Sequence, residues 1–167
     1  MTLPPASVTA GHKSYVTYSL PGVHVNEVSV TLFESPALLG ASGTTGFRTW
    51  EASLLLGAFF CSTSGQGYVK GKSLLELGAG TGLLAILCAK HLGAKSVLAT
   101  DGARNVLEDL KTNIELNDLE SSPLLKVKSL KWGHSLIGAG PVLFGEDSDF
   151  ELAFGSDIVS KPYRKAV

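Results

Sequence analysis

The fold is decided by residues 74–85, which read Leu74-Leu75-Glu76-Leu77-Gly78-Ala79-Gly80-Thr81-Gly82-Leu83-Leu84-Ala85. An apolar run typical of a buried strand leads into three alternating glycines, and the pattern of a helix follows. Glycines at such a turn permit unusual backbone angles and let a ligand approach the backbone, where the helix N-terminus presents free amide groups. The stretch therefore predicts a nucleotide-binding turn, although glycine-rich turns also close ordinary strands.

The flanking sequence alternates between short apolar runs and helical patterns. Strands are expected at 72–77, 96–100, 124–130 and 151–154, and helices at 82–92 and 105–116. Strand–helix–strand units of this length imply a parallel sheet with right-handed crossovers. The sequence thus predicts an α/β, Rossmann-like, mostly parallel sheet. We expect it to be truncated after its fourth core strand, because the chain ends soon afterwards.

The residues before the glycine turn carry a different pattern. Runs at 15–20 and 23–33 are rich in β-branched and aromatic residues, which predicts a β-hairpin that turns at Pro21-Gly22. From Thr49 to Phe60 the pattern becomes helical. We therefore expect an N-terminal hairpin and a helix ahead of the sheet.

Composition limits the domain organisation and the class of partner. The 167 residues suit one domain, and 44% hydrophobic with 17% charged residues can form a core. Residues 1–13 are rich in Pro, Ser and Thr and are expected to be a flexible segment, which leaves 14–167 as the partial domain. The net charge of −1 makes nucleic acid an unfavoured partner, because phosphate binding calls for excess basic charge.

The cysteines and the apolar runs indicate the cellular setting. Cys61 and Cys88 cannot build a disulfide framework, and no Cys/His spacing suggests a metal site. The N-terminus lacks the features of a signal peptide, and no apolar run reaches the ~18 residues that span a bilayer. We expect a cytoplasmic protein without a membrane or metal partner.

Two acidic residues accompany the glycines. Asp101 ends the strand after the turn, where its carboxylate can accept hydrogen bonds from both ribose hydroxyls of a nucleotide. Its alternative role is to cap the helix that begins near residues 102–104, and the two roles can coexist. Glu76 lies in an apolar strand, where an unpaired charge is costly, so we expect it to be hydrogen-bonded at the turn.

The glycine spacing discriminates between cofactors. A dinucleotide site has the spacing G-x-G-x-x-G, whereas residues 76–82 have E-x-G-x-G-x-G. This form resembles motif I of the class I methyltransferases. In that family the backbone around the glycines contacts the methionine end of the cofactor, and the acidic residue after the second strand holds the ribose. The resemblance implies S-adenosyl-L-methionine as the cofactor.

Three further segments resemble the seven-β-strand protein-lysine methyltransferases. They are Thr44–Ala52, Asp101–Leu119 with its Asn113-x-x-Leu116-Asn117 motif, and Leu130-Lys131-Trp132. Residues 30–119 are most similar to the branch that methylates a lysine of elongation factor 2. The resemblance implies an enzyme that transfers a methyl group to a protein lysine, with elongation factor 2 as its protein partner.

The turn and this resemblance together define the candidate site. The expected cofactor-binding residues are Trp50, Glu76, Gly78, Ala79, Gly80, Gly82, Asp101, Trp132 and Ser156. Asp157 is the catalytic candidate, because a carboxylate beside the lysine amine could orient it and assist proton loss. Outside the motif, the two tryptophans would be interpreted as ordinary core residues.

The chain departs from the family pattern at one point. The family's fourth strand ends in Asp-x-x-Tyr, whereas this sequence has Asp157-Ile158-Val159-Ser160, and Tyr163 is out of register. Two alternatives therefore stay open. One is a truncated or inactive pseudo-methyltransferase that acts by binding only, and the other is a methyltransferase for a small molecule or nucleic acid.

Overall fold

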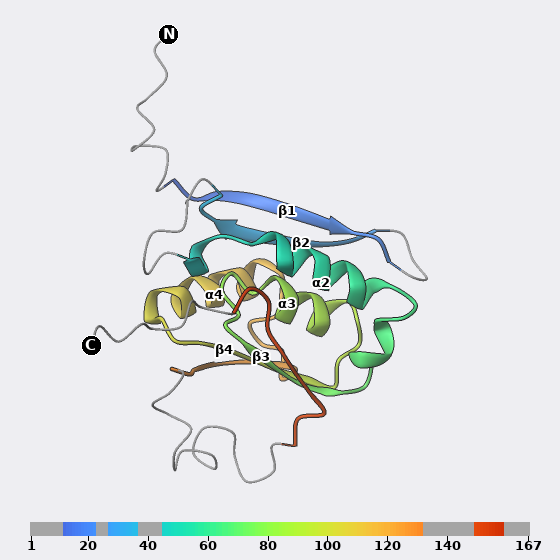
Figure 1. The fold of residues 1–167 in the computed structure, drawn as a ribbon. Helices are drawn as coiled ribbons and strands as arrows, with labels where there is room; N and C mark the ends of the chain where they lie inside the picture. Colours follow the sequence, from blue (N-terminus) through green and yellow to red (C-terminus); the bar gives the residue numbers. More distant parts are fainter. Residues whose placement is uncertain (1–11, 23–26, 37–44, 132–148, 159–167) are drawn as a thin grey trace, which may run out of the picture.

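The computed structural model has three layers, which are a two-stranded hairpin, a layer of helices and a four-stranded sheet (Figure 1). The structure describes residues 12–22, 27–36, 45–131 and 149–158. In chain order the elements are β1 (Ser14–Leu20), β2 (Val28–Glu34), the 3₁₀ helix η1 (Thr45–Phe47), α2 (Glu51–Cys61), the 3₁₀ helix η2 (Gln66–Tyr68), β3 (Ser73–Leu77), α3 (Leu83–Lys90), β4 (Ser96–Asp101), α4 (Arg104–Leu116), β5 (Leu125–Ser129) and β6 (Leu152–Phe154).

The sheet is parallel throughout, with the strand order β5-β4-β3-β6. Leu77 pairs with Thr100 and Asp101 pairs with Ser129, so β3, β4 and β5 end at the same edge. Parallel strands in such a sheet bring the loops that follow them together at this carboxyl edge. The predicted α/β, Rossmann-like arrangement is confirmed, and it places the glycine turn next to the end of β4.

The middle layer holds helices α2, α3 and α4, which lie between the sheet and the hairpin (Figure 1). Residues 83–89 of α3 are all buried, because the helix has the sheet on one side and the hairpin on the other. A helix that is apolar all round is expected at such a position. Helix α4 is amphipathic instead, and it buries Val106, Leu110, Asn113 and Ile114.

The N-terminal hairpin is confirmed, but its predicted turn is wrong. Leu20 pairs with Val28, so residues 21–27 connect the strands and β2 begins five residues later than expected. The buried positions of β2 are Val30, Leu32 and Glu34, which alternate and face the helices. Packing of this alternating face fixes the strand register, because a shift by one residue would turn these side chains outward.

The remaining predicted elements agree with the structure to within about two residues at each end. Helix α3 begins at Leu83 rather than Gly82, because Gly82 has a left-handed φ of 89° and forms the N-cap. Both cysteines are free and buried, as expected for small hydrophobic thiols. None of the helices in the described residues combines the length and apolar character that crossing a membrane requires.

Leu87 tests whether the middle layer carries the stability of the fold. Its side chain is fully buried in α3, whereas Leu55 on α2 is 74% exposed. We expect Leu87→Ala to lower the free energy of unfolding by about 2–5 kcal/mol, and Leu55→Ala to change it by less than about 0.5 kcal/mol. Urea denaturation of both variants measures the difference, and equal losses would contradict this arrangement of layers.

Candidate functional site

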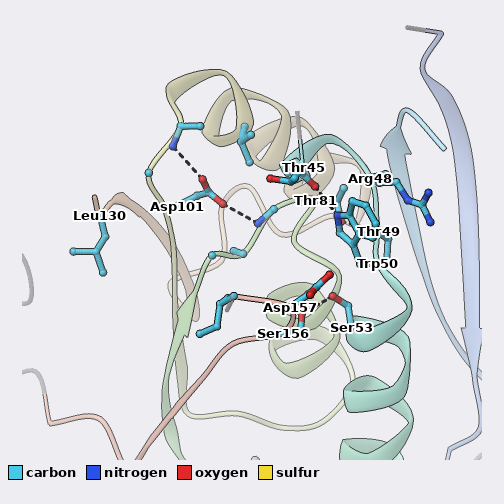
Figure 2. Close-up of a pocket in the computed structure, with 18 of the residues that line it drawn as sticks. Thr45, Arg48, Thr49, Trp50, Ser53, Thr81, Asp101, Leu130, Ser156 and Asp157 are labelled. Atoms are coloured by element: carbon cyan, nitrogen blue, oxygen red, sulfur yellow. Dashed lines mark hydrogen bonds between the residues drawn. The ribbon is translucent and has the colours of Figure 1, made fainter. Parts of the chain in front are cut away.

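A cavity of about 690 Å³ opens at the carboxyl edge of the sheet (Figure 2). This volume lies in the range of small-molecule and cofactor sites. Loops after β3, β4, β5 and β6 line the cavity together with η1 and the start of α2. The lining residues are Thr45, Gly46, Arg48, Thr49, Trp50, Ser53, Gly78, Ala79, Gly80, Thr81, Asp101, Gly102, Ala103, Val106, Leu130, Lys131, Ser156, Asp157 and Ile158.

The glycine turn, residues 78–82, forms one wall of this cavity. Its three glycines all have positive φ angles, 66° at Gly78, 55° at Gly80 and 89° at Gly82. Such angles are strained for residues with a side chain. At Gly82 a Cβ atom would also lie only 2.2 Å from the Cδ1 atom of Leu110. Backbone conformation therefore explains the alternating glycines, and packing adds a second reason at Gly82.

Asp101 joins the glycine turn to the end of β4 (Figure 2). Its Oδ2 atom accepts the Gly80 N–H at 3.1 Å, and its Oδ1 atom accepts the Ala103 N–H at 3.0 Å. The second bond makes an Asx turn, and the N-cap of α4 is Ala103. The alternative of Asp101 as the N-cap is therefore wrong. Each carboxylate oxygen keeps a further lone pair with which it can accept a hydrogen bond from a ligand.

Glu76 lies in β3, two residues before the glycine turn, and is not among the residues that line the cavity. It is only 2% exposed, and its Oε2 atom has no hydrogen-bond partner among the described residues. Burial raises the pKa of Glu76 to about 8, with a contribution from the negative charge of Asp101, and the backbone N–H of Ala85 acts against the shift. Near neutral pH the group is therefore mostly a neutral acid, which reduces the cost of burying it.

Trp50 and Arg48 form the opposite wall. The guanidinium of Arg48 stacks over the Trp50 ring at 4.5 Å from its centroid and pairs with Glu51. The Trp50 Nε1–H donates to the carbonyl of Thr45 at 2.7 Å. These contacts hold the indole at the cavity from both its face and its edge.

The loop after β6 closes the site against α2 (Figure 2). The hydroxyls of Ser156 and Ser53 are 2.6 Å apart and share a hydrogen bond. Asp157 follows with a φ of 55°, which is uncommon for residues other than glycine but tolerated by aspartate. Its side chain is exposed at the cavity and able to contact an incoming group.

Buried polar groups support the wall that carries the glycine turn. The carboxylate of Glu34, 1% exposed, accepts the Tyr18 hydroxyl at 2.5 Å and the Thr49 N–H at 2.7 Å. Burial, and then the bond to Glu34, raise the pKa of Tyr18, so this hydroxyl stays protonated as a donor. The hydroxyls of Thr49 and Thr81 are 2.8 Å apart. The hairpin thus reaches the glycine turn through hydrogen bonds.

The structure brings most of the predicted site residues together. Those that line the cavity are Trp50, Gly78, Ala79, Gly80, Asp101, Ser156 and Asp157. Glu76 and Gly82 are not among the lining residues. Trp132, like Ser160 and Tyr163, is outside the described residues. Contact of each residue with a cofactor stays a prediction.

Sequence reasoning missed several lining residues around Trp50. Arg48, Thr49 and Ser53 all line the cavity. Two of the three lie inside the Thr44–Ala52 segment, whose resemblance to the methyltransferases was the available signal. Lys131 also lines the cavity, directly before Trp132.

The fold and the cavity define a Rossmann-like domain with a nucleotide-type site at the carboxyl edge of its sheet. Residues 40–161 match a family model described as lysine methyltransferase. The chain therefore belongs to the lysine methyltransferase family, as its motifs predicted.

Two relatives support the branch to which the sequence resemblance pointed. The protein-lysine N-methyltransferase EFM3 of Chaetomium thermophilum is 44% identical over 158 residues, which are 93% of this chain and 46% of that protein. The human protein-lysine N-methyltransferase EEF2KMT is 34% identical over 140 residues, 78% of this chain and 39% of that protein. The chain thus spans less than half the length of these relatives.

Among solved structures, a putative methyltransferase, SMU.776 complexed with SAH, is similar at 16% identity with a TM-score of 0.48. The similarity covers 74% of this chain and 27% of that one.

Glu76 makes stability depend on pH in a defined direction. The unfolded chain releases this proton near the ordinary value of 4.5, whereas the folded chain keeps it to about pH 8. The free energy of unfolding therefore falls as pH rises between these values. Glutamine does not titrate, so we expect the free energy of unfolding of Glu76→Gln to rise relative to that of the wild type by up to about 1.4 kcal/mol per pH unit in this window. Chemical denaturation at several pH values tests this, and a constant difference would contradict a neutral Glu76.

Proposed function

We propose that this chain forms the cofactor-binding part of an S-adenosyl-L-methionine-dependent protein-lysine N-methyltransferase. Elongation factor 2 is the proposed protein substrate, and the cytoplasm is the proposed location. The proposal depends on the hydrogen bond between the Gly80 N–H and Asp101 at the cavity. This bond joins the glycine turn to the acidic residue that is expected to hold the ribose. Membership of the lysine methyltransferase family supports it.

The described residues fit the proposed cofactor. A Cβ atom at position 80 would contact the backbone of Gly46, another lining residue, at 3.6 Å, and the φ of 55° is strained for residues with a side chain. The Asp101 carboxylate lines the cavity with acceptor capacity to spare for the ribose hydroxyls. The indole of Trp50 gives the opposite wall an apolar surface.

When bound, S-adenosyl-L-methionine supplies a methyl group that its positively charged sulfur makes electrophilic. The protein must then hold a neutral lysine amine in line with the methyl group, so positioning and exclusion of water contribute most. Asp157 is the proposed residue that orients the amine and assists proton loss. The bond between Ser156 and Ser53 fixes the loop before it.

Two observations support a protein lysine as the acceptor. EFM3 and EEF2KMT are both named as protein-lysine N-methyltransferases. The resemblance of residues 30–119 to the elongation factor 2 branch supports this factor as the proposed partner. The net charge of −1 disfavours RNA or DNA.

Asp101→Asn tests the cofactor site directly. The amide keeps one acceptor oxygen, but its NH₂ group then faces either the Gly80 or the Ala103 N–H. We expect the Kd for S-adenosyl-L-methionine, measured by calorimetry, to rise about 10- to 100-fold.

Asp118→Asn is the matched control, because it makes the same change at an exposed residue outside the cavity. Its φ of 60° also suits asparagine. The control should bind with the affinity of the wild type. An equal loss of affinity in both variants, or no binding by the wild type, would refute the proposed site.

Methyl transfer is tested with labelled cofactor and purified elongation factor 2. We expect label on a lysine of this protein and none on RNA. Asp157→Asn should lower kcat about 100-fold and leave the Kd of the cofactor within about threefold of the wild type, because asparagine tolerates the φ of 55°. Cofactor binding without transfer by the wild type would instead identify a chain that acts by binding only.

A further inference from the structure

Among the described residues, one edge of β2 is paired with side chains rather than with a strand. Strand β1 covers the other edge, and α4 runs along this one. Asn113 lies in α4 and Asn117 is the C-cap of this helix, and both side chains reach β2. Asn117 accepts the Thr31 N–H at 3.2 Å and donates to the Thr31 carbonyl at 2.7 Å, as a neighbouring strand would.

Asn113 makes only half of the same contact. Its Oδ1 atom accepts the Phe33 N–H at 2.7 Å, but its Nδ2 atom donates to the carbonyl of Thr81 at 2.9 Å. The side chain is fully buried. If the amide were flipped, its NH₂ group would face the Phe33 N–H and its oxygen would face the Thr81 carbonyl. Neither pair can form a hydrogen bond, so the contacts fix the orientation of the amide.

Thr81 is the residue of the glycine turn whose side chain can form hydrogen bonds. It lies between Gly80 and Gly82, which have no side chains and a wide choice of backbone angles. Asn113 bonds its carbonyl, while its hydroxyl bonds Thr49, whose N–H in turn donates to Glu34 on β2. Both connections lead from the turn to the N-terminal hairpin.

We propose that Asn113 is a positioning residue for the cofactor. Asn113 holds the glycine turn through Thr81 and couples the shape of the turn to the edge of β2. The neighbouring Gly80 N–H bonds Asp101, so a displaced Thr81 would alter the geometry of the nucleoside site. The inference rests on the proposed function of this turn in binding S-adenosyl-L-methionine.

Asn113→Ser and Asn117→Ser form a matched pair of test variants. Serine is too short to bridge Phe33 and Thr81, and each variant removes hydrogen bonds between α4 and β2, but only the first releases Thr81. Amide hydrogen exchange of residues 79–82 is compared with that of residues 97–99 in β4, which report on global stability. We expect exchange in the turn to accelerate at least 10-fold relative to β4 in Asn113→Ser only.

The affinity for S-adenosyl-homocysteine, measured by calorimetry, is the second readout. The Kd should rise about 10-fold in Asn113→Ser and less than about threefold in Asn117→Ser. Equal effects of the two variants on exchange or on affinity would overturn the proposal, and so would an unchanged Asn113→Ser.

Two provisions keep the outcomes distinct. If Asn113→Ser does not fold, Asn113→Thr replaces it, because threonine leaves a smaller cavity than serine and is likewise too short to bridge Phe33 and Thr81. If the wild type binds no cofactor, the proposed function fails, whereas hydrogen exchange still decides whether Asn113 holds the turn.

Discussion

The hydrogen bond from the Gly80 N–H to the Asp101 carboxylate is the contact on which the site depends. It connects the ends of two adjacent parallel strands, and the second Asp101 oxygen extends the connection to the start of α4. The carboxylate accepts one backbone amide from each of two loops, at 3.1 and 3.0 Å, and so links the loop after β3 to the loop after β4. The cavity between turn and helix thus has a wall whose shape is defined before a ligand arrives.

Burying the polar groups behind this wall costs free energy, and the structure compensates for this cost in a different way at each group. The Glu34 carboxylate accepts hydrogen bonds from two donors, and both the oxygen and the nitrogen of the Asn113 amide are hydrogen-bonded. Glu76 has an oxygen without a partner in the described residues and responds through its pKa, which burial raises to about 8. Glu34 and Asn113 both connect to the hairpin, so the N-terminal strands belong to the architecture of the site as well as to the core.

Local pattern predicted the strands and helices, because apolar periodicity and glycine punctuation are properties of neighbouring residues. It also predicted Asp101, whose place at the end of a strand is fixed by the same periodicity. The hairpin connection was placed wrongly since its length follows from the packing of Val30 and Leu32 rather than from Pro21-Gly22. The bond between Ser53 and Ser156 joins residues 103 positions apart, and no local signal announces it. The position of Glu76 was open to inference, because strand alternation places it on the same side as the buried Leu74.

The asparagines along β2 have a consequence for association between molecules. An open strand edge exposes a row of backbone donors and acceptors that can recruit a strand from another chain. Here amide side chains occupy the free N–H groups of Thr31 and Phe33 and the Thr31 carbonyl. The side chains of Asn113 and Asn117 thus occupy backbone groups of β2 that a strand from another chain would otherwise bond.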